Sequence, residues 1–197
     1  MSPGGAPPGW TELPLRGRLL VASTKLGDPN FERTVILVLD HGEEGALGVV
    51  LNRPTLVPVD EILDTWAAQA SMARPDVIFR GGPVSPDAVI GLARAPATAT
   101  DAGQWRSVVD AVGIVDLAVP PDAQPMVPEG ARLFSGYAGW AADQLEGELA
   151  EGAWFVVDAL GDDVFCSEPE QLWHDVVRRQ RGALKMLATY PPNPSMN

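Results

Sequence analysis

The sequence is poor in the residue types that build metal centres and disulfides. Its 197 residues include one cysteine, Cys166, and two histidines, His41 and His174, so an intrachain disulfide and a CxxC metal motif are both excluded. A catalytic zinc site usually needs several histidine or cysteine ligands, and these three residues stand at no recognised spacing. The sequence therefore predicts no metal and no cofactor.

The common phosphate-binding and nucleophile motifs are also missing. The chain has two lysines, Lys25 and Lys185, and neither stands in a GxxxxGK[ST] loop; a GxGxxG loop is absent as well. Ser135 lies between Phe134 and Gly136, so it is not part of a GxSxG nucleophile elbow. No nucleophile–base pair can be recognised, and the sequence therefore predicts no catalytic residues and favours a non-catalytic protein.

Long hydrophobic runs are absent too. No apolar run approaches the roughly 20 residues that span a bilayer, and residues 1–14 are rich in proline and glycine without the apolar segment of a signal peptide. We therefore expect no membrane contact and a cytoplasmic location, which a single cysteine suits. The expected organisation is a flexible tail over 1–14, one domain over 15–190 and a second tail over 191–197.

Positive charge is scarce. Fourteen lysines and arginines face 26 acidic residues, giving a net charge of −12, and such a chain repels polyphosphate at long range. The dense basic cluster Arg178-Arg179-Arg181 is either the solvated end of a helix, which we prefer, or a nucleic-acid site. The charge balance argues against direct nucleic-acid binding. The acidic pair Asp162-Asp163 is expected on a solvated face.

What the chain does contain is a strong strand signal at its centre. The run from Thr34 to Leu39 is β-branched and aliphatic, and a Gly-bearing turn connects it to a second apolar run from Ala46 to Leu51. This pattern predicts a β-hairpin. Neither run alternates with polar residues, so we expect both faces to be covered and the hairpin to lie inside the sheet.

Three helices are predicted after this hairpin in the sequence. The segment from Val59 to Met72 has apolar residues at spacings of three and four, and a second helix is expected from about Ala141 to Glu151. A third helix begins after Ser167 and Glu170, which have capping-box spacing. Its buried stripe should comprise Leu172, Trp173, Val176 and Val177. Strands mixed with peripheral helices make an α+β domain.

Short motifs along most of the chain, from about Arg16 to the C-terminus, resemble one protein family. They are Leu19-Leu20-Val21-Ala22-Ser23, Asp28-Pro29-Asn30-Phe31, Arg33-Thr34-Val35, His41, Gly45-Ala46-Leu47-Gly48, Leu51-Asn52-Arg53-Pro54, Gly81-Gly82-Pro83-Val84, Phe134-Ser135-Gly136-Tyr137-Ala138-Gly139-Trp140, Gln144-Leu145-Glu146 and Gly152-Ala153-Trp154. In this order they resemble the AlgH/YqgE-like family. The resemblance implies a bacterial, cytosolic protein of an uncharacterised family whose members carry the label of transcriptional regulator. It also implies a flattened, barrel-like mixed sheet with peripheral helices.

Two reactive residues, His41 and Cys166, each admit two interpretations, and His174 has one. His41 stands beside Asp40 and Glu43; it is either a general base oriented by a carboxylate or, as we prefer, a turn histidine that bonds its own loop. Cys166 is either a nucleophile or a buried small hydrophobe, and the second is preferred. His174 is taken as a surface histidine.

Two arginines and an asparagine are the strongest candidates for contact with a ligand. Asn52 and Arg53 end a buried strand, a place where open sheets often position ligands, and Arg33 precedes the other strand of the hairpin. A guanidinium offers a planar fork to a carboxylate or phosphate. The alternative for each arginine is an internal salt bridge, which we prefer.

The glycine-rich turns complete the candidate list. Gly81 and Gly82, and the segment containing Gly136 and Tyr137, allow close backbone approach. They form either tight structural turns, the preferred interpretation, or a shallow pocket that binds an anion. The predicted ligand-binding residues are thus Arg33, Asn52, Arg53, Gly81, Gly82 and Tyr137.

Two functional classes remain open; a third, a direct DNA-binding regulator, follows only from the label of the family that the chain resembles, and the net charge of −12 argues against it. The first is a non-catalytic binding or regulatory protein that acts through a partner protein or a small ligand. The second is an enzyme with an unrecognised site around Asn52, Arg53 and the turns at Gly81 and Gly136. The missing nucleophile–base pair favours the first class. The sequence specifies neither the ligand nor the oligomeric state.

Overall fold

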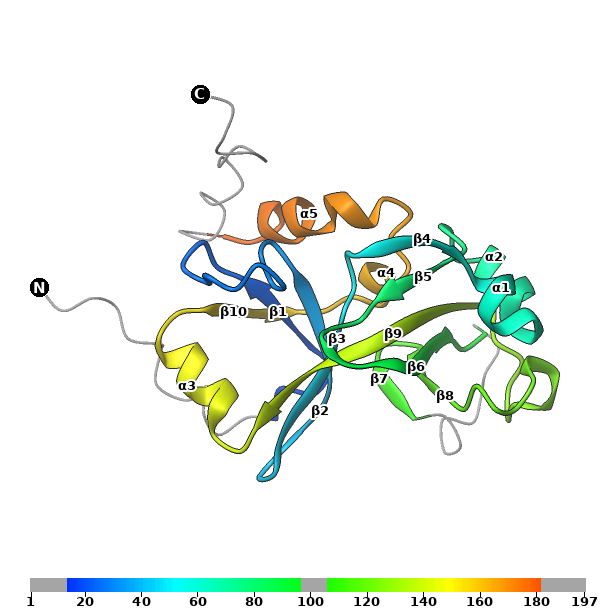
Figure 1. Ribbon diagram of the computed structural model, residues 1–197, viewed down its shortest axis with the longest axis horizontal. Coiled ribbons are helices and arrows are strands. Elements are labelled where there is room, and N and C mark those ends of the chain that lie inside the picture. The colour runs from blue at the N-terminus through cyan, green and yellow to red at the C-terminus, as the bar shows by residue number, and fades with distance from the viewer. Residues whose placement is uncertain (1–13, 97–105, 182–197) are drawn as a thin grey trace, which may run out of the picture.

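A curled β-sheet forms the centre of the molecule, and short helices lie around its edges (Figure 1). The computed structural model describes residues 14–96 and 106–181. The predicted tails 1–14 and 191–197 therefore lie outside the described residues, apart from Pro14.

The sheet has the strand order β10-β1-β2-β3-β9-β6-β8-β7, with β5 joined to β9 and β4 joined to β5. Its strands are β1 (Arg18–Ala22), β2 (Val35–Gly42), β3 (Gly45–Val50), β4 (Pro54–Pro58), β5 (Val77–Arg80), β6 (Val84–Arg94), β7 (Ser107–Val109), β8 (Val112–Val115), β9 (Gly130–Ala141) and β10 (Trp154–Asp158).

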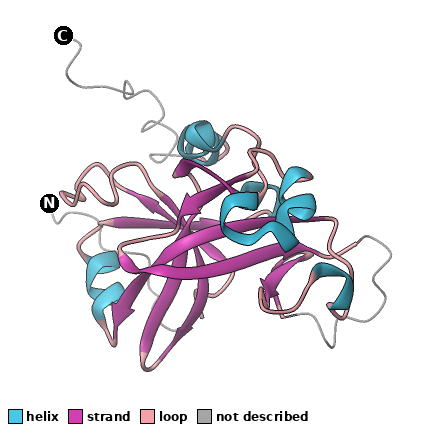
Figure 2. Ribbon diagram, turned by 45° about the vertical axis from the view of Figure 1, so that its right-hand side comes forward, coloured by secondary structure: helices cyan, strands magenta, loops and turns pink. Residues whose placement is uncertain are grey.

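The predicted α+β class and mixed sheet are confirmed. All strand pairs are antiparallel except β5 with β9, where Phe79 lies opposite Phe134 in a parallel pair. The strands fan out and curl into half of a barrel (Figure 2). Among the described residues the barrel stays open, because β10 and β7 stand at opposite ends of the strand order.

The central hairpin is also confirmed. Strand β2 lies between β1 and β3, and successive side chains point to opposite faces. Leu37 and Leu39 belong to one buried cluster, whereas Ile36 and Val38 belong to another. All four are at most 1% exposed, so the unbroken apolar run reflects burial on both faces.

Strand β9 connects the two parts of the sheet. Its first residues pair with β6, with Gly130 opposite Arg94, and its last residues pair with β3, with Ala138 opposite Gly48. Gly136 lies just before the change of partner and has a φ of 68°, a conformation that glycine adopts without steric cost. The long strand thereby carries Trp140 to the far end of the sheet.

The helical segments are α1 (Val59–Leu63), η1 (Asp64–Trp66), α2 (Ala67–Ser71), η3 (Pro121–Ala123), α3 (Gln144–Ala150), α4 (Gly161–Val164), η4 (Pro169–Gln171) and α5 (Leu172–Arg178). No helix within the described ranges has the length and apolar character needed to cross a membrane.

The predicted helix from Val59 to Met72 is correct in position but wrong in continuity. It divides into α1, the 3-10 helix η1 and α2, because the backbone leaves helical geometry at Leu63 (φ −149°, ψ 76°). Trp66 and Ala70 are buried as the spacing predicts, whereas Ile62 is 54% exposed. The break rotates Ile62 away from the face that the later residues bury.

The last predicted helix is confirmed in its buried stripe, since Leu172, Trp173, Val176 and Val177 are all at most 2% exposed. The predicted capping box is wrong. The 3-10 helix η4 stands before α5, and no side chain caps either segment. Pro169 begins η4, and its fixed φ suits a first helical position without any side-chain cap.

Candidate functional site

One loop, residues 23–34 between β1 and β2, borders two hollows in the surface, one at each of its ends. Local hydrogen bonds set its shape. The Asp28 carboxylate accepts from the backbone and side-chain N–H groups of Asn30 (2.8 and 3.0 Å). The Phe31 N–H donates to the Asp28 carbonyl (3.0 Å), and the Thr34 N–H donates to the Phe31 carbonyl (3.1 Å). An aspartate that bonds the backbone two residues later is typical of a tight turn.

The first hollow collects three of the predicted ligand-binding residues. It has a volume of about 640 Å³ and lies between the loop, the start of β4 and the start of α5. We call it the arginine hollow. It is lined by Glu32, Arg33, Asn52, Arg53, Pro54, Glu170, Gln171, Trp173 and His174.

The two arginines of the hollow are held in different ways. The Arg33 guanidinium lies 5.5 Å from the ring centroid of Trp173, a cation–π distance, and its backbone has a left-handed φ of 51°. Arg53 is exposed, and its Nη2 donates to the Glu32 carbonyl (2.6 Å). No carboxylate pairs with Arg53 within the described ranges, so the predicted salt bridge is absent at this arginine.

Asn52 is bound by the backbone on both sides of its amide. Its Oδ1 accepts from the Val35 N–H (2.9 Å), and its Nδ2 donates to the Arg33 carbonyl (2.8 Å). The side chain is 8% exposed. Asn52 therefore joins the end of β3 to the start of β2 and holds the Arg33 backbone in place at the edge of the hollow.

His174 also lines the arginine hollow. Its ring packs edge-on against Trp173, with centroids 5.1 Å apart and planes at 85°. The Nδ1 atom is buried and has no hydrogen-bond partner among the described residues. The predicted surface histidine is thus half-buried.

The predicted glycines and Tyr137 lie elsewhere. The N–H and carbonyl of Gly81 bond to β9 and β3 (2.8 Å each). A Cβ at Gly81 or Gly82 would collide with the backbone of Gly136 or Tyr137. These glycines therefore permit two segments to cross closely, which agrees with their interpretation as tight structural turns. None of Gly81, Gly82 and Tyr137 lines the arginine hollow.

His41 does not bond its own loop through its side chain, so that interpretation is wrong. Its Nδ1 accepts from the Leu15 N–H (3.2 Å), and its Nε2 lies 2.8 Å from Glu146 Oε1 in α3. An accepting Nδ1 leaves the proton on Nε2, which donates to the carboxylate. Among the described residues no hydroxyl or thiol bonds to this imidazole, and the histidine connects three segments that are far apart in the sequence.

Arg132 was not recognised from the sequence, although it is one of the most deeply buried side chains. It is 2% exposed, and burial lowers the pKa of its guanidinium to about 10. Its Nη1 and Nη2 atoms donate to the carbonyls of Ala73, Arg74, Val164 and Cys166 at 2.7–3.1 Å. Arg132 therefore joins the segment after α2 to the last residue of α4 and the segment that follows it.

Cys166 lies beside that guanidinium and packs against the main core cluster. Burial raises the pKa of its thiol; a backbone hydrogen bond from Glu168 and the charge of Arg132 act in the opposite direction. A raised pKa reduces the thiolate fraction near neutral pH, and the thiolate is the reactive form.

The basic cluster on α5 is partly neutralised by a carboxylate that we expected in solvent. Asp163 is 5% exposed, and its two oxygens accept from Arg179 at 2.5 and 2.7 Å. Arg178 lies 3.7 Å from Asp175. The solvated interpretation is therefore wrong for Asp163, and Arg179 belongs to a two-pronged ion pair.

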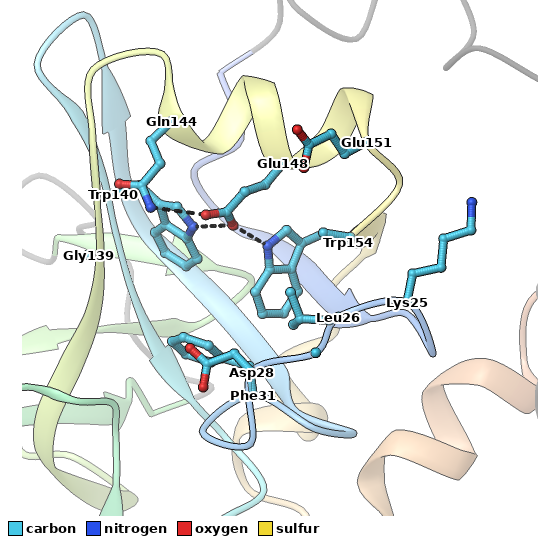
Figure 3. Close-up of a pocket in the computed structure, with 12 residues that line it drawn as sticks. Lys25, Leu26, Asp28, Phe31, Gly139, Trp140, Gln144, Glu148, Glu151 and Trp154 are labelled. Carbon is cyan, nitrogen blue, oxygen red and sulfur yellow. Dashed lines mark hydrogen bonds between the residues drawn. The ribbon is translucent and has the colours of Figure 1, made fainter.

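A second hollow was also missed. We call it the tryptophan pocket: it lies at the other end of loop 23–34 and has a volume of about 370 Å³ (Figure 3). Phe31, Trp140 and Trp154 are among its walls, and Glu148 of α3 lies between the two indoles. These residues come from four separate segments, so no spacing in the sequence could bring them together.

The half-barrel architecture defines the class of protein. The structure resembles that of DIP2367 from Corynebacterium diphtheriae, with a TM-score of 0.80 and 32% identity over 88% of this chain and 91% of that chain. It also resembles AlgH from Pseudomonas aeruginosa, with a TM-score of 0.65 and 27% identity over 98% and 100% of the two chains.

Sequence comparison specifies the family. The AlgH-like family model matches residues 19–185, and the chain belongs to this family. A UPF0301 protein of Streptomyces coelicolor is 53% identical over 193 residues, which cover 96% of this chain and 99% of that protein. A UPF0301 protein of Thermobifida fusca is 45% identical over 94% of this chain and 96% of its own length.

Proposed function

We propose that this is a cytosolic, non-catalytic binding protein, with the arginine hollow as its site for a small anionic ligand. The observation that carries the proposal is the placement of Arg33 and Arg53 on one hollow of a chain with net charge −12. A guanidinium presents its donors in a planar fork that matches a carboxylate or phosphate.

The donor inventory supports an anion. The Arg53 guanidinium has five N–H donors, and among the described residues its one hydrogen bond goes to the Glu32 carbonyl. Glu32 and Glu170 also line the hollow, and their negative charge repels an anion. An anionic ligand therefore has to contact both arginines to offset this repulsion.

The size of the hollow supports a small molecule. Pockets for small ligands have volumes of about 300–1,000 Å³, and the arginine hollow measures about 640 Å³. Carboxylate and phosphate ligands share the chemistry that a guanidinium recognises. We expect regulation, where it occurs, to follow ligand binding and contact with a partner protein, not direct contact with DNA.

The histidines support the absence of catalysis. His41 bonds Leu15 and Glu146, and His174 packs against Trp173. Neither bonds to a hydroxyl or thiol in the described part of the chain, whereas an activated nucleophile needs a base within hydrogen-bond reach. We also propose that residues 15–190 form a single domain, which carries the arginine hollow.

Isothermal titration calorimetry with inorganic phosphate and with citrate tests the proposal. Arg53→Ala should weaken binding about tenfold, the effect of losing a charge-assisted hydrogen bond. Arg178→Ala is the matched control, because it removes the same charge from an exposed arginine outside the hollow. A phosphate preference would identify a phosphoryl ligand and a citrate preference a carboxylate. Absence of binding to either anion, or equal effects of the two variants, would refute the proposal.

A further inference from the structure

The tryptophan pocket has the form of an aromatic cage. Trp154 packs edge-on against Trp140, with centroids 6.0 Å apart and planes at 80°. Phe31 also packs edge-on against Trp154, at 5.6 Å and 74°. The three rings therefore present walls in different planes, as Figure 3 shows.

A single carboxylate positions the two indoles. Glu148 Oε2 accepts from the Nε1–H groups of both Trp140 (2.9 Å) and Trp154 (2.7 Å). Its Oε1 accepts from Gln144 Nε2 (3.0 Å). All three contacts are N–H donations to the carboxylate. In Figure 3 both rings extend from Glu148 toward Phe31.

The walls are rigid before any ligand arrives. Trp140 is 7% exposed and Trp154 is 3% exposed, and both belong to the same buried cluster as the β2 residues Ile36 and Val38. Because packing and hydrogen bonds already hold the rings, a ligand would bind without the entropic cost of ordering them. Phe31, on the loop, is half-buried.

The charge of the pocket is negative. Asp28, Glu148 and Glu151 line it together with a single cation, Lys25. In Figure 3 the amine of Lys25 points away from the rings, whereas Glu148 lies between them. Aromatic faces attract cations through their quadrupole, and tryptophan does so most strongly. Aromatic walls and carboxylates thus favour the same kind of ligand.

We propose that the tryptophan pocket is a second binding site, specific for a small organic cation with a methylated ammonium group. The rings contact the methyl groups and attract the charge, and the carboxylates complement it. The site rests on observations independent of the arginine hollow, with which it shares no lining residue. An experiment that refutes one of the two proposed sites therefore leaves the other proposal unaffected.

The sharpest test compares choline with 3,3-dimethylbutan-1-ol, a neutral molecule of the same shape. Each is titrated into the full-length, ¹⁵N-labelled protein while the indole N–H resonances of Trp140 and Trp154 are followed by NMR. We expect choline to shift both resonances at millimolar concentration and the neutral alcohol to bind at least about fivefold more weakly, the scale of a cation–π contact. Equal affinity for the two would overturn the proposal, as would a lack of shift with choline.

Variants at exposed or half-buried positions separate recognition from folding. Phe31→Leu keeps an apolar side chain but removes a ring, and Glu151→Gln removes one charge from the rim; each should weaken choline about three- to fivefold. Glu43→Gln, in the β2–β3 turn outside the pocket, is the matched charge control and should change nothing. Unchanged choline affinity in Phe31→Leu, with the indole resonances at their native positions, would contradict the cage. Tighter binding of acetate than of choline would contradict the sign of the charge.

Discussion

Single residues in this protein join segments that are distant in the sequence. Arg132 bonds four backbone carbonyls from two separate segments, and its guanidinium lies 4.4 Å from the ring centroid of Phe79. Asn52 joins β3 to β2, and His41 joins Leu15 to α3. A buried polar group is tolerated when its hydrogen bonds are made, and these contacts make each residue difficult to replace.

Arg132→Lys tests the strongest of these links. A lysine ammonium has three donors on a single atom and cannot span the four carbonyls that the guanidinium reaches. The substitution should lower the free energy of unfolding by about 2–4 kcal/mol. Arg94→Lys is the control; Arg94 forms a solvent-accessible pair with Asp162, so the loss there should be about 1 kcal/mol or less. Urea denaturation measures both, and equal losses would contradict a special role for Arg132.

The chemistry of Cys166 gives a second residue-scale prediction. Burial raises the pKa of its thiol, so the thiolate fraction is small below the ordinary thiol range and grows as the pH rises through the shifted pKa. Labelling by an aromatic disulfide reagent at neutral pH should be slow in the native protein and fast in denaturant. The time course of absorbance gives both rates. Native labelling as fast as in denaturant would revive the nucleophile interpretation.

At the scale of elements, the β2–β3 hairpin is the scaffold on which the site is built. Strand β2 begins beside Arg33, and β3 ends just before Asn52 and Arg53, so the hairpin brings both arginines to one end of the sheet. Leu37 lies in the middle of β2, is 0% exposed and belongs to the main core cluster. A change in the hairpin core should therefore affect the whole domain.

Leu37→Ala should lower the free energy of unfolding by about 2–5 kcal/mol, the usual cost for a buried leucine. A histidine in an exposed turn would cost about 1 kcal/mol or less. The contacts of His41 with Leu15 and Glu146 raise that expectation to about 1–2 kcal/mol for His41→Ala. Urea midpoints with equal m-values check both. Equal, small shifts would place the hairpin at the surface and contradict the core.

Elements with strong local signals could be predicted, and contacts between elements could not. The sequence pattern alone predicts burial for two sets of residues, and the structure shows both buried. They are the unbroken apolar run in β2 and the stripe of Leu172, Trp173, Val176 and Val177. The break at Leu63 (φ −149°, ψ 76°) could not be seen in the apolar spacing of the segment. Arg33, Asn52 and Arg53 could be nominated because they flank strong strands, whereas the tryptophan pocket needs segments whose distances only the fold sets.

For the whole molecule, charge is the property that the sequence states most directly. The net charge of −12 opposes approach to a polyanion. Within the described residues, the basic cluster of α5 is reduced by the pairing of Arg179 with Asp163. The likeness to AlgH and to the UPF0301 proteins establishes family and fold. The identity of a ligand has to be inferred from the residues that line the site.

Fluorescence anisotropy with labelled duplex DNA tests the charge argument. At about 150 mM salt we expect nothing tighter than non-specific binding in the micromolar range. A scrambled duplex of equal length is the control for sequence preference. Nanomolar, sequence-selective binding would show that the protein is a direct DNA-binding regulator after all.

The central claim is that the arginine hollow binds a small anion, and chemical-shift mapping tests it most directly. Citrate and inorganic phosphate are each titrated into the ¹⁵N-labelled protein while backbone and histidine ring resonances are recorded. The account predicts saturable shifts confined to the walls of the hollow, at the backbone amides of residues 32–33, 52–53, 170–171 and 173–174 and at the ring of His174. Shifts centred instead on Arg178-Arg179-Arg181, or no saturable shift with either anion, would contradict it.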